Sequence, residues 1–173
     1  NWVQFPWYNN TSMLGITPSS NSTFYVYGSS YEHGKSINNV EEPPAHWVGV
    51  LMHIDKFGKI ISGKYFGNWR TSYKVSSVIE LPNGNLIVYL ASFIDPYISR
   101  IICINKAGDI LWAAPLQTIS LYKEINKEIP VICQLKNGNI AVARIMVRNI
   151  ADTLQYPFLP PIILPAPLNY FHL

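Results

Sequence analysis

The chain has 173 residues, of which 49% are hydrophobic, 13% aromatic and only 13% charged, and its formal net charge is +3. This length suits a single domain that buries a sizeable core. Because the Lys and Arg residues are scattered, the sequence lacks the concentrated basic face that nucleic acid binding requires.

The N-terminal residues 1–10, NWVQFPWYNN, begin a stretch without Asp, Glu, Lys or Arg that runs to residue 31, and residues 153–173 lack them too. Chain ends are normally polar and solvated, so we expect both ends to pack against something. N-x-Ser/Thr sequons begin at Asn9, Asn10 and Asn21. Together with a first residue that is not Met, they favour an extracellular or cell-surface glycoprotein.

Residues 12–30 and 46–67 each predict a β-hairpin, separated by a loop at 31–45. The first hairpin turns near Pro18 and Asn21, and the second turns at IDKFGKI (54–60). A polar turn with Gly in its penultimate position is a short-hairpin signal, because Gly adopts positive φ at little steric cost. The two hairpins predict a four-stranded antiparallel unit over residues 11–74.

The same order of strands recurs downstream. Residues 77–92 and 99–115 predict two hairpins of a second unit (75–125), and the turn INKAGDI (104–110) aligns with IDKFGKI. Residues 130–146 repeat the first hairpin, and the turn LKNGN (135–139) takes the place of LPNGN (81–85). Residues 156–168 take the place of the third strand in a third unit (126–173). Residues 1–10 would supply its fourth strand, from the same or a neighbouring subunit. The chain is thus predicted to be one all-β repeat domain over residues 1–173.

This pattern resembles the blade-like repeats of prokaryotic secreted β-propeller proteins over about residues 12–146. The resemblance is carried by the strand and turn positions Leu81, Asn83, Gly84, Ile87, Val88, Ile104, Asn105, Gly108, Ile110 and Trp112, and in the first unit by Ile54, Asp55, Gly58, Ile60, Tyr65 and Gly67. It implies blade-like sheets in a family that is mostly non-enzymatic. Because propellers close with at least about four blades, three units indicate a piece of a longer propeller, an association of copies, or openly stacked sheets.

No motif indicates catalysis, a metal or a cofactor. The sequence lacks G-x-S-x-G, and its four His residues lack metal-ligand spacing. Cys103 and Cys133 lie in apolar runs without the spacing of a zinc ribbon or c-type haem site. Two buried free thiols and one disulfide between neighbouring sheets remain equal alternatives.

The C-terminal residues 156–173 are strongly apolar, but their prolines exclude a transmembrane helix. Pro-rich apolar segments suit an edge strand that another chain covers. We therefore expect strand complementation between copies, with an interface formed by Trp2, Phe5, Trp7, Phe158, Ile162, Ile163 and Leu164.

The leading functional hypothesis is a non-enzymatic extracellular structural protein that self-assembles into a filament or ring. One alternative is a carbohydrate- or surface-binding module, in which aromatic side chains stack on sugar rings; its candidates are Tyr25, Tyr27, Tyr31, Trp47 and Trp69. Another alternative is a fragment of a larger β-propeller enzyme.

Overall fold

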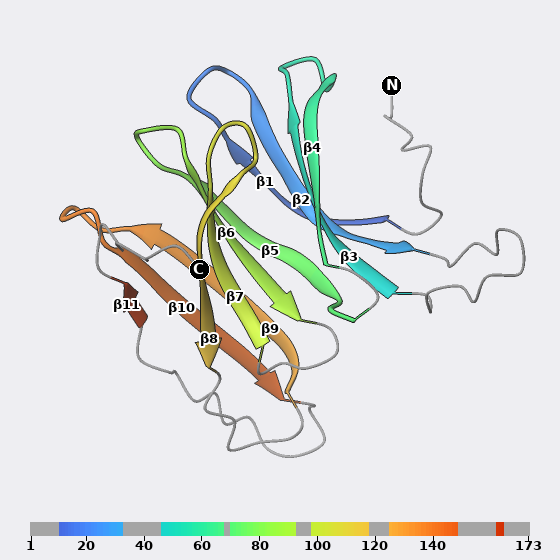
Figure 1. The fold of residues 1–173 in the computed structure, drawn as a ribbon, viewed down its shortest axis with the longest axis vertical. Coiled ribbons are helices and arrows are strands. Elements are labelled where there is room, and N and C mark those ends of the chain that lie inside the picture. The colour runs from blue at the N-terminus through green and yellow to red at the C-terminus, as the bar shows by residue number, and fades with distance from the viewer. Residues whose placement is uncertain are drawn as a thin grey trace, which may run out of the picture.

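The computed structural model describes residues 11–32, 46–67, 70–92, 98–117, 125–148 and 162–164. Every regular element among them is a β-strand, and no helix long and apolar enough to cross a membrane occurs in this part of the chain. The strands, coloured by residue number in Figure 1, are β1 (Thr11–Pro18), β2 (Phe24–Glu32), β3 (His46–Ile54), β4 (Ile60–Phe66), β5 (Tyr73–Glu80), β6 (Leu86–Ser92), β7 (Ile98–Ile104), β8 (Ile110–Gln117), β9 (Ile125–Gln134), β10 (Ile140–Arg148) and β11 (Ile162–Leu164).

These strands form three antiparallel sheets. The first sheet has the order β1-β2-β3-β4, the second β5-β6-β7-β8 and the third β11-β10-β9. The predicted all-β fold with antiparallel four-stranded sheets is therefore confirmed. The predicted third strand of the last unit is present too, since β11 pairs with β10 from Ile140↔Leu164 to Val142↔Ile162.

One turn geometry joins four of the five described hairpins. In each, the residue that follows the first strand (Asp55, Leu81, Asn105 or Leu135) donates its N–H to the carbonyl four residues later and accepts from the N–H three residues later, at 2.8 to 3.0 Å. The fourth position is always a Gly with φ between 80° and 89°. This is the type I turn with a left-handed residue that suits a three-residue hairpin loop, and it explains why a Gly recurs at the same place in these turns.

The β1–β2 turn has the same form without the glycine. The Ser19 N–H donates to the Thr23 carbonyl at 2.9 Å, and Ser22 takes the left-handed position with φ 55°. A side chain in this region costs about 1–2 kcal/mol relative to the right-handed one. Because connections alternate between the two ends of a meander, all five turns lie at one end of the strands, at the upper and left margins of Figure 1.

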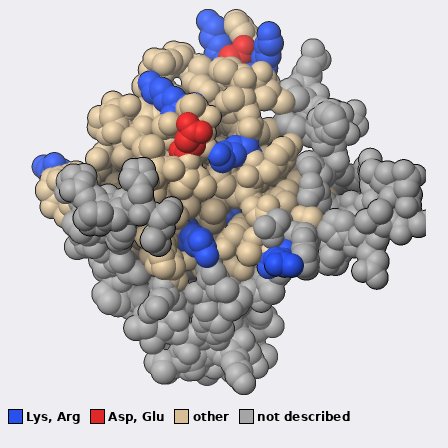
Figure 2. Space-filling view, in the orientation of Figure 1, with Lys and Arg blue, Asp and Glu red and all other residues tan. Residues whose placement is uncertain are grey.

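The second sheet is the middle layer. One of its faces contributes Val75, Val78, Leu86, Val88, Leu90, Ile102 and Ile104 to a core shared with the first sheet. The other face contributes Ile87, Tyr89, Ala91, Ile101, Cys103 and Leu116 to a core shared with the third sheet. The protein is thus a stack of three sheets with two junctions. On the face drawn in Figure 2, the described Lys and Arg side chains are spread singly rather than gathered into one basic patch.

Replacing Ser22 by Gly should raise the free energy of unfolding by about 1 kcal/mol, because Gly adopts the left-handed conformation without strain. The measurement is urea unfolding of both proteins under identical conditions. Gly58→Ala is the matched control: a Cβ at Gly58 would meet nothing within 4 Å, so its loss of about 1 kcal/mol would report backbone strain alone. Destabilisation by Ser22→Gly would contradict the shared turn geometry.

Candidate assembly surface

Each sheet junction is built by the first strand of the following sheet. The strand β5 lies against all four strands of the first sheet, and β9 lies against β5 and β6 of the second. At the first junction Val75 and Val78 are 0% and 2% exposed, and at the second junction Ile132 is 6% exposed. One face of the first sheet and one face of the second therefore each receive the first strand of the following sheet.

The strand β1 has the side chains of such a junction strand but leaves them exposed. When the β1–β2 and β5–β6 turns are aligned, Met13 matches Val75 and Ile16 matches Val78. The β-bulge falls at the same place in both hairpins, between Met13 and Gly15 and between Val75 and Ser77. Yet Met13 is 39% and Ile16 59% exposed. We define the outward side of β1, with Met13, Leu14 and Ile16, as the β1 face.

On this side of the first sheet the edge strands are exposed, whereas the central strand is buried. Strand pairing aligns Met13 with Gly28 and Val50 across the sheet. In the centre, Val48, Val50 and Met52 are only 3–4% exposed, whereas Tyr65 on the opposite edge strand is 48% exposed. A partner would therefore contact this sheet along an edge strand.

The third sheet presents the complementary surface. When the β9–β10 and β5–β6 turns are aligned, Cys133, Ala141 and Ala143 match Ile79, Ile87 and Tyr89, which in the second sheet pack toward the third. In the third sheet, by contrast, Cys133 and Ala143 are exposed and Ala141 is half-buried. Val131, opposite Ala143, is 53% exposed. We define Val131, Cys133, Ala141 and Ala143 as the outer face of the third sheet.

The predicted strand-complementation residues are only partly described. Trp2, Phe5, Trp7 and Phe158 lie outside the described residues, as do the sequons at Asn9 and Asn10. Ile162, Ile163 and Leu164 form β11, which is the edge of the third sheet. The position beside β11 that a fourth strand would take thus borders the outer face of the third sheet. Asn21 lies exposed in the β1–β2 turn.

The structure does not bring the candidate sugar-binding aromatics onto one exposed platform. Tyr25 is buried and stacks on His53 with ring centroids 4.6 Å apart, and Tyr27 packs against the core of the first junction. Tyr31 contacts Trp47 at 5.1 Å, toward the other end of β2. Alternation along β2 directs Tyr25 and Tyr27 toward the second sheet, where they pack with the core of the first junction. Trp69 lies outside the described residues.

The two cysteines are not paired. Cys103 is buried in the second junction, whereas Cys133 is exposed. Because side chains alternate along β9, Ile132 points toward Cys103 and Cys133 points away from it. A disulfide between the two sheets would require β9 to expose its opposite face to the second sheet. The expectation that both thiols are buried holds only for Cys103.

The β1–β2 turn is fastened to the second sheet by Glu80. The Ser20 N–H and hydroxyl donate to the two carboxylate oxygens of Glu80 at 3.1 and 2.9 Å, and the Thr17 hydroxyl donates to the Val78 carbonyl at 2.9 Å. Burial raises the pKa of Glu80, but hydrogen bonds from Ser19 and Ser20 and the charge of Lys106 outweigh burial and lower it.

No protein-family model matches the chain, and no curated protein matches it. The resemblance to propeller blades therefore stays a prediction. Among the described residues no three His, Cys, Asp or Glu side chains are grouped so that they could hold a metal ion.

The lowered pKa of Glu80 predicts acid sensitivity. A carboxylate with a lower pKa in the folded than in the unfolded protein stabilises the fold above the unfolded-state value of about 4.3, and this stabilisation is lost as the pH falls through the folded-state pKa. Urea midpoints measured across this range should therefore fall less steeply for Glu80→Gln than for the unmodified protein, with Ser20→Ala intermediate. Equal slopes would contradict the role of this carboxylate.

The cysteines predict one reactive thiol per folded chain. Burial raises the pKa of the Cys103 thiol, and because the thiolate is the reactive form, Cys103 should react only after unfolding. Titration with a thiol reagent should count one group in the dilute native protein and two in denaturant, and Cys133→Ser should abolish the native reaction. No reactive thiol in either state would indicate the disulfide instead.

Proposed function

We propose that the protein is a non-enzymatic extracellular structural protein whose copies associate by adding sheet to sheet. The β1 face of one copy lies on the outer face of the third sheet of the next copy, as β5 lies on the first sheet and β9 on the second. The observation that carries this proposal is the exposure of Met13 and Ile16 at the positions where Val75 and Val78 are buried.

The two surfaces suit each other physically. Neither the β1 strand, TSMLGITP, nor the outer face of the third sheet contains a charged residue, so association would desolvate no ion. The small side chains of Cys133, Ala141 and Ala143 let a strand with the larger Met13 and Ile16 approach closely. Burial of this apolar surface is favourable in proportion to its area.

The contact joins two different surfaces, so it is heterologous and generates a ring if the rotation closes or a filament if it does not. Two copies with three sheets each would bring six sheets together, within the range of roughly four to eight blades found in propellers. The edge at β11 remains the place for the proposed strand complementation by residues 1–8, which would add ladder hydrogen bonds to the same contact.

The test uses one substitution on each surface. Ile16→Lys and Ala143→Lys should each weaken self-association at least about tenfold, because each places a charge in an apolar contact. Each variant alone should therefore be a monomer by native mass at concentrations where the unmodified protein is assembled. Phe57→Lys is the matched control, since Phe57 is 83% exposed in the β3–β4 turn, away from both surfaces.

A mixture of the two variants decides whether the contact is heterologous. The intact β1 face of Ala143→Lys can pair with the intact third sheet of Ile16→Lys, so the mixture should form dimers and nothing larger. In the unmodified protein, alkylation of Cys133 should slow as the protein concentration rises. A monomeric unmodified protein, or a mixture that stays monomeric, would overturn the proposal.

A further inference from the structure

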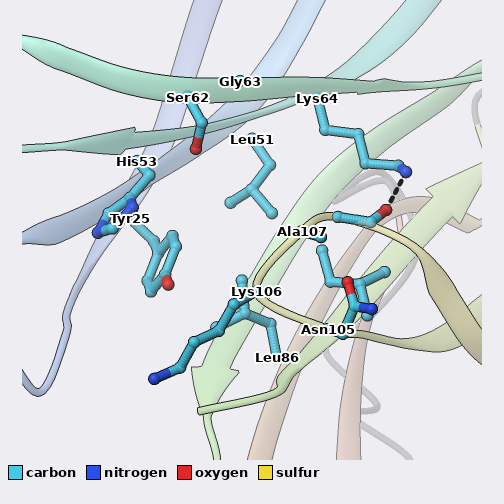
Figure 3. A pocket seen from close by; sticks show the side chains of 12 residues that line it. Tyr25, Leu51, His53, Ser62, Gly63, Lys64, Leu86, Asn105, Lys106 and Ala107 are labelled. Carbon is cyan, nitrogen blue, oxygen red and sulfur yellow. Dashed lines mark hydrogen bonds between the residues drawn. The ribbon is translucent and has the colours of Figure 1, made fainter.

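A pocket of about 190 Å³ opens at the first junction, at the end of the strands where the hairpin turns lie. Its floor is formed by three aliphatic side chains of the core that are only 2–4% exposed: Leu51, Leu86 and Ile104. Figure 3 shows Leu51 and Ser62 entering the pocket from the first sheet, with Tyr25 closing one side. At the mouth, Ser62 on β4 and Ala107 in the β7–β8 turn are exposed, so a solute can reach the floor.

The charged groups of the lining are directed away from the pocket. The Lys64 ammonium donates to the Gly108 carbonyl across the gap between the sheets (Figure 3). The Lys106 side chain lies over Gly84 of the β5–β6 turn, and its charge acts on Glu80. The two lysines thus contribute their aliphatic stems to the pocket. An ion would lose its water there without gaining an opposite charge, so the pocket favours an uncharged occupant.

Three polar side chains of the lining have partners within the protein. The His53 ring stacks on Tyr25, and its Nε2 lies 2.7 Å from the Thr23 hydroxyl. The Asn105 side-chain amide donates to the Asp109 carboxylate at 3.0 Å, and its oxygen accepts from the Asp109 N–H at 2.8 Å. The hydroxyl of Tyr25 shares a hydrogen bond with the Ser19 side chain. These groups hold the walls in place rather than reach for a ligand.

The Ser62 hydroxyl is the polar group that points into the open space of the pocket in Figure 3. A hydroxyl offers one donor and two acceptor lone pairs. It can therefore form a hydrogen bond with a single polar group of an occupant whose remaining atoms lie on the apolar floor.

The equivalent place at the second junction is filled by an aromatic ring. The repeat aligns the cross-strand pair His53 and Ser62 with the pair Cys103 and Trp112. Cys103 belongs to the apolar core of the second junction, and Trp112 packs against it. At the first junction the small Ser62 leaves that place open. The pocket thus lies where a ring completes the packing of the other junction.

We propose that this pocket binds a small uncharged ring compound with one polar substituent. The ring lies against Leu51 and Leu86, and the substituent forms a hydrogen bond with Ser62. The pocket is comparable in size to an apolar cavity of about 150 Å³ that binds benzene, so a single ring with a short substituent fits. A sugar ring suits the site less, because its many hydroxyls would meet the apolar floor without hydrogen-bond partners. The site lies within one copy of the chain, so binding does not depend on the self-association proposed above.

The experiment is saturation-transfer NMR of the intact protein with phenol, whose hydroxyl is uncharged at neutral pH. Transfer to phenol should approach a plateau as the phenol concentration rises, whereas glucose should show no transfer. Ser62→Trp should abolish the transfer to phenol, because the new side chain fills the pocket as Trp112 fills its place at the second junction. A urea unfolding curve verifies that this variant folds.

The matched control is Ile61→Trp, which introduces the same side chain at the neighbouring residue of β4. Ile61 is 54% exposed, and alternation directs it to the opposite side of the sheet from Ser62. Transfer to phenol should therefore be unchanged in this variant. An equal loss in both variants, or no loss in Ser62→Trp, would show that phenol binds elsewhere and would overturn the proposal.

Ser62→Ala tests the hydrogen bond in a variant that changes the packing little. It should weaken phenol binding about fivefold, since it removes one neutral hydrogen bond, and it should leave the binding of toluene unchanged. Equal weakening of both compounds would contradict the role of the hydroxyl. The proposal fails if phenol shows no saturable transfer with the unmodified protein. It fails as well if glucose shows a transfer that Ser62→Trp abolishes, because the pocket would then be a sugar site.

Discussion

The structure depends on the burial of both faces of the second sheet. Five consecutive residues of β6, Leu86 to Leu90, are at most 4% exposed, and alternation divides them between the two cores. A strand that is apolar on both sides cannot face water on either, so the first and third sheets must both pack against it. The same requirement leaves each outer sheet with a surface that no described strand of the second sheet covers.

Because the same turn is repeated, the junctions between the sheets use equivalent residues. Because the five hairpin loops have the same length, the residues three and six positions before each turn lie at equivalent heights on the junction strand, allowing for the bulge. Val78 on β5 and Ile132 on β9 therefore contact the preceding sheet in the same way. Ile16 is the equivalent residue of β1, where no described sheet precedes. The turns that follow β1, β5 and β9, with positive φ at Ser22, Gly84 and Gly138, thus fix which side chains of these strands can form a junction.

The sequence predicted the hairpins well because the signals are local: a Gly that must adopt positive φ, flanked by apolar runs. It also predicted β11, which continues the strand order of the repeat although prolines stand on both sides of it, at Pro161 and Pro165. It could not predict the exposure of Ile16 or Cys133, since alternation gives two faces without saying which one a neighbouring sheet covers. For the same reason the aromatic side chains of β2 suggested a sugar platform, whereas Tyr25 and Tyr27 face the second sheet. The pocket at the first junction could not be predicted because its lining residues come from five strands and a turn, and only the register brings them together.

The two junctions differ in a way that the packing of the junction strands explains. The strand β5 lies against all four strands of the first sheet, and the core of that junction includes Tyr25, Leu51 and Phe66 from three of them. The strand β9 lies against β5 and β6, and the side of the second sheet near β8 needs a bulky side chain such as Trp112 to complete the core. At the first junction the residue equivalent to Trp112 is not needed to complete the core. The exposed Ser62 occupies that position without loss of the core, so a pocket and closely packed apolar side chains lie a few residues apart at the same junction.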